Sequence, residues 1–495
     1  MANNLEEITA AVQALPLFYQ PIFGYEVQGA KPVRNCEDRL ADVKKIYDLL
    51  SAELGRPLRV LDLGCAQGYF SLYAAKWGGG GTGLDFEQAN IDLCRLLARD
   101  NPNFKVNFVQ STIEDFLPSV KAGEYDLVLC FNVLHWCVKF SGFEKVQALL
   151  TDLSQKIYIG IFELALKSEG LYPDWGLPEN YRDYLSGYSF VRAITYYFRH
   201  VREDIRHIKR PFCFASNKYA WFENLGLLKI DDVLVSPRGA RTTCYFCGDK
   251  FVKLTDITDE AQHGRAQREI NFLNTFGGQK GLPRLYATLT EQDETGMRII
   301  HVRDMIKGKT LREKIFNGEE FDRWDVIRQM LEWMVLFEQQ GYYQGDIGAH
   351  NIIYCDDGKV YPIDYETVNT SPKLFLWLYS AKLQFLNFMN FLLKLNEFEN
   401  SPVCYLTDLK KYLTPRQYER IAAIREDEKF FSRMYEILFE PEKDSEAYTV
   451  AETEILAIER YISYVGTKLQ ELEEQSKEQR RRIEQLEKII EGRVK

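Results

Sequence analysis

VLDLGCAQGYF, at residues 60–70, decides the fold of the first part of this chain. The apolar run at 58–63 predicts a buried strand, and 69–76 predicts a helix. Gly64 and Gly68 fall in the turn between them, where the backbone must pass close to a ligand and a Cβ would collide. The N–H groups at the start of such a helix can face polar ligand atoms. The stretch therefore predicts a ligand site where the first strand meets its helix.

Three further segments extend this pattern. Asp85 ends the next predicted strand about 20 residues on, where a carboxylate can accept both hydroxyls of a ribose. VQSTIEDF and YDLVLCFNVLHW follow at 109–116 and 125–136. The loop reads D-x-G-x-x-x-G, one residue longer between its glycines than the dinucleotide fingerprint. Four motifs in this order resemble the class I methyltransferases that bind S-adenosylmethionine, and a domain that has lost its ligand or binds a nucleotide is the alternative.

The resemblance implies which residues contact the cofactor. The segment 62–68 would wrap its methionine part, Asp85 would hold the ribose, and 112–114 would border the adenine. Asn132 and His135 would lie beside the methyl donor, since ligands of open α/β sheets bind at the carboxyl ends of the strands. The cofactor residues so assigned are Asp62, Gly64, Cys65, Gly68, Asp85, Phe86, Thr112, Ile113, Glu114, Asn132 and His135.

Two segments before the first strand, at 19–27 and 31–39, occupy a position from which N-terminal segments often cover the cofactor. Tyr19 and Arg34 are therefore further candidates for the cofactor site. Arginines here could bind an anionic acceptor, because a guanidinium offers paired donors to phosphate or carboxylate. Surface salt bridging is an equally good explanation.

A second set of signatures, QGDIGAHN at 344–351 and PIDYE at 362–366, indicates phosphoryl transfer. This chemistry needs a carboxylate to receive the hydroxyl proton of the acceptor, oxygen ligands for magnesium and a cation on the nucleotide phosphates. Asp346 is the expected base, and Asn351 and Asp364 are the expected metal ligands.

The residues before this set complete the pattern. An alternating, hairpin-like stretch ends with Lys253, and the amphipathic helix that follows carries Glu269, which can pair with that lysine and orient it toward phosphates. Gly239, in the phosphate loop, is a further candidate for binding ATP, as are Arg303 and Met305 in a predicted hinge.

The order of these residues is similar to the protein kinase-like superfamily, with departures. The phosphate loop has only one glycine, Gln344-Gly345 replaces His-Arg before the aspartate, and Tyr365-Glu366 replaces Phe-Gly after Asp364. GD-x-x-x-x-N with I-D-[FY]-E resembles the small-molecule and lipopolysaccharide-sugar kinases, whose acceptors are carbohydrate hydroxyls. A pseudokinase scaffold is the alternative.

Apolar residues at alternating spacings of three and four from Ile462 to Ile490 predict a coiled coil, with a single charged helix as the alternative. The chain of 495 residues has a net charge of −10, which argues against a general nucleic-acid binder. Ten cysteines, and an N-terminus without the pattern of a signal peptide, predict reduced thiols in a cytoplasm.

The order of methyltransferase, sugar-type kinase and coiled coil resembles the bacterial bifunctional methyltransferase/kinases that terminate polymannose O-antigen chains (the WbdD family). The expected fold class is α/β, with a Rossmann-like methyltransferase domain at 1–235, a two-lobed kinase-like α+β domain at 236–445 and a coiled coil from 446–495. The family implies ATP with Mg²⁺ to phosphorylate the terminal mannose of a lipid-linked glycan, and S-adenosylmethionine to methylate that phosphate.

The resemblance also implies partners and a location. It implies a trimer formed through the coiled coil, a mannosyltransferase polymerase as partner, and a peripheral place on the cytoplasmic face of the inner membrane. Two rivals stay open: a kinase and methyltransferase acting on another glycan or small molecule, and a scaffold whose kinase fold organises a polymerase.

Overall fold

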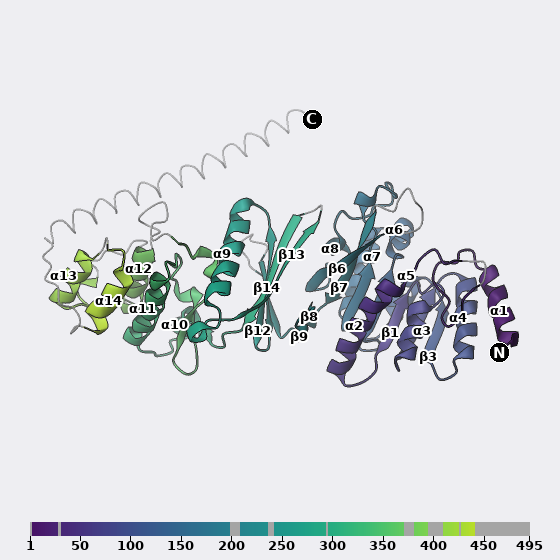
Figure 1. The fold of residues 1–495 in the computed structure, drawn as a ribbon, viewed down its shortest axis with the longest axis horizontal. Helices are drawn as coiled ribbons and strands as arrows, with labels where there is room; N and C mark the ends of the chain where they lie inside the picture. Colours follow the sequence, from purple (N-terminus) through teal and green to yellow (C-terminus); the bar gives the residue numbers. More distant parts are fainter. Residues whose placement is uncertain are drawn as a thin grey trace, which may run out of the picture. The chain divides into compact units, whose positions relative to one another are not determined.

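The computed structural model describes residues 2–27, 31–198, 208–235, 242–293, 296–370, 381–394, 409–424 and 427–440. The chain forms two compact units, Met1–Ile257 with Tyr286–Met305, and Thr258–Leu285 with Ile306–Lys495. Each unit is described by itself below, and Figure 1 labels their elements. Gly239 and the expected coiled coil at 446–495 lie outside the described residues.

The first unit contains a seven-stranded sheet with the strand order β3-β2-β1-β4-β5-β7-β6 (Figure 1). Strands β1 to β5 run parallel, and β7 pairs antiparallel with both β5 and β6. The strands are β1 (Arg59–Leu63), β2 (Gly80–Asp85), β3 (Lys105–Gln110), β4 (Leu127–Phe131), β5 (Ile159–Glu163), β6 (Phe190–Phe198) and β7 (Lys209–Ser216).

Helices cover both faces of this sheet, because alternate residues of its buried strands point to opposite sides. Leu127 and Leu129 of β4 belong to a core shared with α2 and α3, whereas Val128 and Cys130 belong to a core shared with α5, α6 and α7. The helical elements of this part are α1 (Ala2–Gln13), α2 (Glu37–Leu54), α3 (Tyr69–Lys76), α4 (Gln88–Asp100), α5 (Ile113–Phe116), η1 (Leu117–Ser119), α6 (Leu134–Ser141), α7 (Phe143–Ser154), η2 (Lys167–Glu169) and α8 (Tyr181–Tyr184).

A five-stranded sheet with the order β10-β11-β12-β14-β13 adjoins the first sheet. Tyr245, Val252 and Ile300 of this sheet pack in the same core as α2 and Trp221, so the two sheets share a hydrophobic interior. The strands of this sheet are β10 (Asp232–Val235), β11 (Thr242–Cys247), β12 (Lys250–Ile257), β13 (Leu285–Asp293) and β14 (Gly296–Asp304). Two further strands, β8 (Tyr219–Phe222) and β9 (Gly226–Lys229), form a separate hairpin. The described parts of the alternating sequence at 231–254 thus form antiparallel strands, as predicted.

The second unit is mainly helical and has its own core, in which α9, α11, α12 and α14 bury Phe272, Phe337, Phe385 and Phe431. A small sheet of order β15-β16-β17 lies beside these helices. Its elements are α9 (Glu260–Phe276), η4 (Gln279–Gly281), β15 (Lys309–Thr310), α10 (Leu311–Phe316), α11 (Arg323–Gln339), η5 (Ala349–Asn351), β16 (Ile352–Tyr354), β17 (Val360–Pro362), η6 (Tyr365–Thr367), α12 (Ala381–Leu393), α13 (Pro415–Ala423) and α14 (Phe430–Phe439). Within the described ranges, no helix combines the length and apolar character needed to span a bilayer.

Candidate active sites

The turn between β1 and α3 needs glycine at two positions. Gly64 and Gly68 both have φ of 73°, in the left-handed region that favours glycine. A Cβ at Gly68 would lie 2.9 Å from the Sγ of Cys94, and one at Gly64 would lie 3.0 Å from the Cβ of Val133. The predicted turn is therefore held by conformation and by packing. Cys65 between them is fully buried in the core, where burial raises the pKa of its thiol.

Asp85 is fixed by three donors at the carboxyl end of β2. Its carboxylate accepts hydrogen bonds from the backbone N–H groups of Ala66 and Glu87, each at 2.9 Å, and from the side chain of Asn90 at 3.3 Å. The bond to Ala66 joins the glycine loop to the carboxylate that the sequence assigns to a ribose. Burial raises the pKa of Asp85. Its neighbour Phe86 is largely exposed.

Asp62 lies inside the domain at the end of β1, where its carboxylate accepts a 2.7 Å hydrogen bond from the hydroxyl of Ser71. Burial is the main cause that raises the pKa of Asp62 to about 7, and the nearby charge of Asp85 adds to it. The group can therefore take up or release a proton near neutral pH, which makes its charge sensitive to a bound cation.

Gln67, which the sequence analysis missed, ties the N-terminal segment to the glycine loop. Its buried side chain accepts from the backbone N–H groups of Tyr19 at 3.1 Å and Gln20 at 2.8 Å. It also donates to Asn90 at 2.7 Å and to the carbonyl of Leu17 at 3.3 Å. A long polar side chain inside a glycine loop was the available signal. The N-terminal segment thus lies against the glycine loop.

Arg34 and Arg39 meet at Glu163, the last residue of β5. Arg34 donates to its carboxylate at 2.8 Å, and Arg39 donates at 2.6 and 2.9 Å. All three side chains are at most 3% exposed, so this is no surface salt bridge. Burial alone would raise the pKa of Glu163, but the two guanidinium groups outweigh it and lower that pKa to about 2. The glutamate is therefore ionised at neutral pH.

A third buried arginine extends this group toward β4. Arg210 of β7 donates twice to Glu169, at 2.8 Å each, and once to the side-chain oxygen of Asn132 at 2.7 Å. Asn132 follows β4 with φ of 59°, and its backbone N–H donates to the carbonyl of Glu163. Arg34, Arg39, Arg210, Glu163 and Glu169, called the arginine cluster below, thus gather three cations and two anions at the carboxyl ends of β4 and β5.

One donor of the arginine cluster has no partner within the described part of the chain. The Nε of Arg34 is buried and makes no hydrogen bond. Its guanidinium lies 5.4 Å from the ring centre of Tyr19, a residue that the sequence placed at the same site. The pKa of the Tyr19 phenol is raised, because the effect of burial is larger than the opposing effect of the Arg34 charge. The cluster therefore contains one buried guanidinium N–H whose hydrogen-bonding capacity is not used.

The remaining methyltransferase residues lie along the same edge of the sheet. Thr112 caps α5 by accepting from the backbone N–H of Asp115 at 3.2 Å, and Ile113 is buried. Glu114 accepts from the hydroxyl of Ser141 at 3.1 Å. His135, on the first turn of α6, is 4% exposed and packs against aromatic residues.

The predicted ATP-binding residues of the first unit lie on β12 and β14. Lys253 is buried on β12 opposite His301 of β14. Arg303 places its guanidinium 4.2 Å from the ring centre of Phe251, and the backbone N–H of Met305 donates to the carbonyl of Asp249. The end of β14 is therefore fixed to the turn between β11 and β12.

The second unit brings together the predicted catalytic segments. The side chain of Asn351 donates to the backbone carbonyl of Asp346 at 3.4 Å, and the carbonyl of Asn351 accepts from Ile363 at 2.8 Å. The side chain of Asp346 is 44% exposed and can meet a substrate. Asp364 has φ of 62°, a left-handed conformation that is uncommon outside glycine. Strain of this kind occurs where the surrounding structure holds a side chain in a required place.

Asp364 is one of three carboxylates that lie close together. Asp364, Glu269 and Glu366 each offer an oxygen, and the three oxygens lie within 4.8 Å of one another. Such a set fits Mg²⁺, which prefers carboxylate oxygens. Glu366 was missed as a candidate ligand, although the sequence analysis noted it as a departure from the kinase pattern.

Gln344 connects the catalytic segment to the metal segment. Its fully buried side chain donates to the backbone carbonyl of Asp364 at 3.0 Å and accepts from the hydroxyl of Thr367 at 3.0 Å. Tyr365 stacks on Phe272 of α9, with ring centres 4.6 Å apart. The departures from the kinase pattern at these two positions are thus built into the packing of the site.

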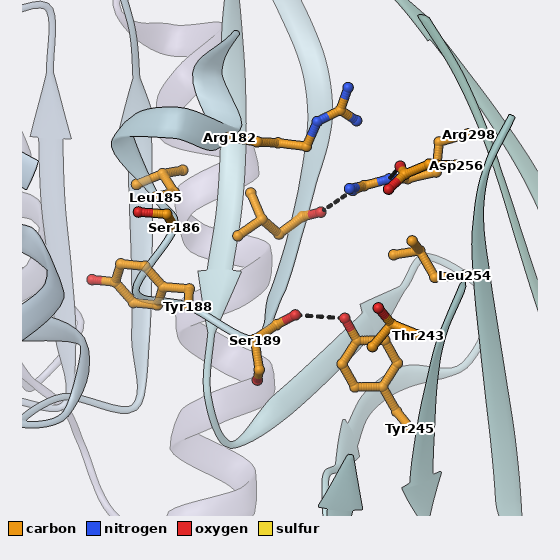
Figure 2. Close-up of a pocket in the computed structure, with 11 residues that line it drawn as sticks. Arg182, Leu185, Ser186, Tyr188, Ser189, Thr243, Tyr245, Leu254, Asp256 and Arg298 are labelled. Carbon is orange, nitrogen blue, oxygen red and sulfur yellow. Dashed lines mark hydrogen bonds and ion pairs between the residues drawn. The ribbon is translucent and has the colours of Figure 1, made fainter. Parts of the chain in front are cut away.

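A pocket of about 150 Å³ lies elsewhere in the first unit (Figure 2). Arg298 crosses it, donating to Asp256 and to the carbonyl of Val191 at 2.9 Å each. Tyr245, from the same side as Arg298, donates to the carbonyl of Ser189 (Figure 2). No residue that the sequence assigns to either site lines this pocket.

Comparison with known proteins relates both units to one family. A family model described as a methyltransferase domain matches residues 60–152. A WbdD protein of Escherichia coli, an O-antigen chain terminator bifunctional methyltransferase/kinase, is 30% identical over 403 residues, which are 78% of this chain and 56% of that protein. A ubiquinone biosynthesis O-methyltransferase of Rickettsia akari is 40% identical over 77 residues, 16% of this chain and 29% of that protein. The chain spans about half the length of the WbdD proteins that it matches.

Solved structures agree with the sequence comparison. A low-resolution structure of WbdD has a TM-score of 0.77 at 26% identity and covers 97% of this chain and 99% of that one. A medium-resolution structure of WbdD has a TM-score of 0.70 at 26% identity, with 92% and 99% covered. The family resemblance predicted from the sequence is therefore confirmed, and so is the predicted α/β fold class with its methyltransferase domain.

Proposed function

We propose that this relative of the WbdD methyltransferase/kinases is a two-step chain terminator. Its kinase phosphorylates the non-reducing terminal mannose of a lipid-linked polymannose with ATP, and its methyltransferase then methylates that phosphate with S-adenosylmethionine. The observation that carries the proposal is the presence of both sets of candidate site residues in one chain that matches WbdD over most of its length. A methyl phosphate on the hydroxyl that the polymerase would extend blocks addition of the next sugar, so polymerisation stops.

In the kinase step, Asp346 accepts the proton of the mannose hydroxyl as that oxygen attacks the γ-phosphorus of ATP, and ADP leaves. Its partly exposed carboxylate supports this role. Lys253 binds the ATP phosphates, and Gly239, Arg303 and Met305 are assigned to the nucleotide from sequence alone.

Asn351 and Asp364 would hold Mg²⁺, as predicted, and the carboxylates gathered at Asp364 add Glu269 and Glu366 as possible ligands. Mg²⁺ would neutralise the negative charge of the ATP phosphates when it is bound. Gln344 positions this segment, because its side chain holds the backbone carbonyl of Asp364.

In the methyl transfer step, a phosphate oxygen attacks the methyl carbon and S-adenosylhomocysteine leaves. A phosphate oxygen is already a nucleophile at neutral pH, so orientation suffices and no strong base is needed. The buried Nε of Arg34 and the adjoining Tyr19 support this role for the arginine cluster. Asp85 would hold the ribose of the methyl donor and Asp62 would face its ammonium group.

The assembly is also proposed from the sequence. The heptads at 462–490 support a coiled-coil oligomer, for which the family resemblance implies a trimer. A mannosyltransferase polymerase is the proposed partner, at the cytoplasmic face of the inner membrane.

Two substitutions separate the two activities. Asp346→Asn should lower phosphate transfer to a mannose oligosaccharide by roughly a thousandfold, because general base catalysis contributes about 10² to 10⁴. The same variant should still methylate an oligosaccharide that carries a phosphate already. Asp85→Asn should do the reverse, and Asp357→Asn, an exposed carboxylate paired with Lys359, is the matched control. Phosphorylation at the normal rate by Asp346→Asn would exclude Asp346 as the base. If this variant lost phosphorylation but kept its effect on chain length, the result would favour the scaffold alternative.

A further inference from the structure

A group of aromatic side chains beside the methyltransferase site is not used by either proposed reaction. The group consists of four aromatic side chains and one lysine whose ammonium group lies near their rings. We call these residues, Trp136, Lys139, Phe140, Tyr172 and Trp175, the aromatic platform. The ring centres of Trp136 and Trp175 are 4.9 Å apart, those of Tyr172 and Trp175 are 4.3 Å apart, and Trp136 stacks on Phe140 at 6.3 Å. The platform is thus one continuous aromatic surface made by α6 and by the segment after η2.

The platform faces outward. Trp136 and Phe140 are 45% and 75% exposed, whereas Leu134, Cys137 and Val138 on the inner side of α6 are buried in the core. The inner side of α6 therefore supplies the apolar contacts that hold this helix in the fold. Contiguous exposed apolar side chains can mark a binding site for a protein, a membrane or a ligand.

The cation of the platform is directed at its rings. The Nζ of Lys139 lies 4.5, 5.1 and 5.2 Å from the ring centres of Trp175, Trp136 and Phe140. No carboxylate of the described residues lies within ion-pair distance of this ammonium group. The lysine therefore stays available to a ligand that lies on the aromatic surface.

The platform is connected to the arginine cluster at two places in the chain. Asn132, which accepts a hydrogen bond from Arg210, lies four residues before Trp136. Glu169, which binds Arg210, ends η2, and Tyr172 follows it by three residues. A molecule whose anionic end occupied the arginine cluster could therefore extend over the platform.

We propose that the aromatic platform binds the sugar rings that follow the terminal phosphosugar of the methyl acceptor. This inference rests on the proposed function and names the part of the acceptor that the arginine cluster does not bind. A pyranose ring has an apolar face of C–H groups that packs flat on an aromatic ring, and its hydroxyls can accept from an ammonium group. A neutral glycan with an anionic end matches a surface of this composition beside three arginines.

The first test compares acceptors of two lengths. We expect the normal protein to have a lower KM for a phosphorylated mannotetraose than for mannose phosphate. Trp136→Ala and Phe140→Ala should each raise the KM of the tetrasaccharide by roughly tenfold, the size expected for one lost aromatic contact, with kcat and the KM of mannose phosphate unchanged. Phe316→Ala is the matched control, because Phe316 is an exposed aromatic residue on α10, outside the platform. An equal change of KM for both acceptors, or no change, would overturn the proposal.

The second test is independent of turnover. When the aromatic protons of the normal protein are saturated, neutral mannotetraose should receive saturation in saturation-transfer NMR, and Trp136→Ala should weaken the mannotetraose signal. This binding would persist even if phosphate methylation were not the reaction, so failure of the proposed function and failure of the platform are distinguishable. Absence of any mannotetraose signal from the normal protein would reject the platform as a glycan site.

Discussion

Glu163→Gln is the most informative single change in the methyltransferase domain. The carboxylate of Glu163 is fully buried and accepts hydrogen bonds from Arg34 and Arg39. Loss of the negative charge leaves two buried guanidinium groups without their counterion, and breaking a buried pair in this way typically costs about 3 to 5 kcal/mol.

The pKa of Glu163 gives a second estimate of this free-energy cost, and the two estimates are of similar size. Its fall from 4.5 to about 2 on folding corresponds to roughly 3 kcal/mol, because each tenfold change in proton affinity is worth about 1.4 kcal/mol. The folded pKa lies below the unfolded one, so this stabilisation is fully present above about pH 4.5. It is lost as the pH falls from there through about 2. The difference between the normal protein and Glu163→Gln should therefore be largest at neutral pH.

The assay is urea unfolding followed by tryptophan fluorescence at pH 7 and at pH 3.5. We expect Glu163→Gln to lower the free energy of unfolding by about 3 kcal/mol at pH 7 and by clearly less at pH 3.5. Glu53→Gln, an exposed glutamate on α2, should change neither value. A variant as stable as the normal protein at pH 7 would refute the assignment of Glu163 as the counterion of the two arginines.

Three further predictions concern single residues of the two sites. Because the pKa of Asp62 is raised to about 7, binding the ammonium group of S-adenosylmethionine should release a proton. Measured by calorimetry, the affinity of the normal protein for S-adenosylmethionine should rise from pH 5 to pH 7 and level off above pH 7. An equally steep rise in the affinity of Asp62→Asn would contradict this role of Asp62. Gln344→Ala should leave the carbonyl of Asp364 without its donor and lower kcat of phosphate transfer by roughly 10- to 100-fold, since an unsatisfied buried group costs about 1 to 3 kcal/mol; an unchanged kcat would show that Gln344 does not position the segment. Gly68→Ala should destabilise the domain more than Gly123→Ala, because both have φ near 70° but only Gly68 would place a Cβ against Cys94, and equal losses in urea unfolding would refute the packing argument.

The sequence predicts well those features of the fold that are determined by residues close to one another in the chain. The left-handed turn at Gly64 and Gly68, the parallel strands that follow and the place of Asp85 all depend on residues close in the chain. The same holds for the antiparallel strands that end near Lys253. These elements follow from periodicity and from the special conformations of glycine.

The arginine cluster could not be predicted in this way. Arg39 and Glu163 are separated by more than a hundred residues, and nothing in the sequence near either one states that they pair. Arg210 lies on a strand that inserts antiparallel beside β5, so its approach to Asn132 depends on the completed sheet. The burial of these charges is a tertiary property, which is why a surface salt bridge stayed open at the level of the sequence.

The sharing of one core by two sheets has the same origin. Tyr245 and Val252 follow the predicted boundary at 235 and 236, yet they pack in the core that contains α2 and Trp221. Apolar residues on a strand indicate that one face is buried, but they do not indicate against which element.

Mass spectrometry of a synthetic α-mannose oligosaccharide, incubated with the protein, ATP, Mg²⁺ and S-adenosylmethionine with each omitted in turn, tests the two-step account most directly. The account predicts a gain of phosphate with ATP and Mg²⁺ alone, and a gain of methyl only on the phosphorylated product. A methyl group transferred without ATP would contradict it.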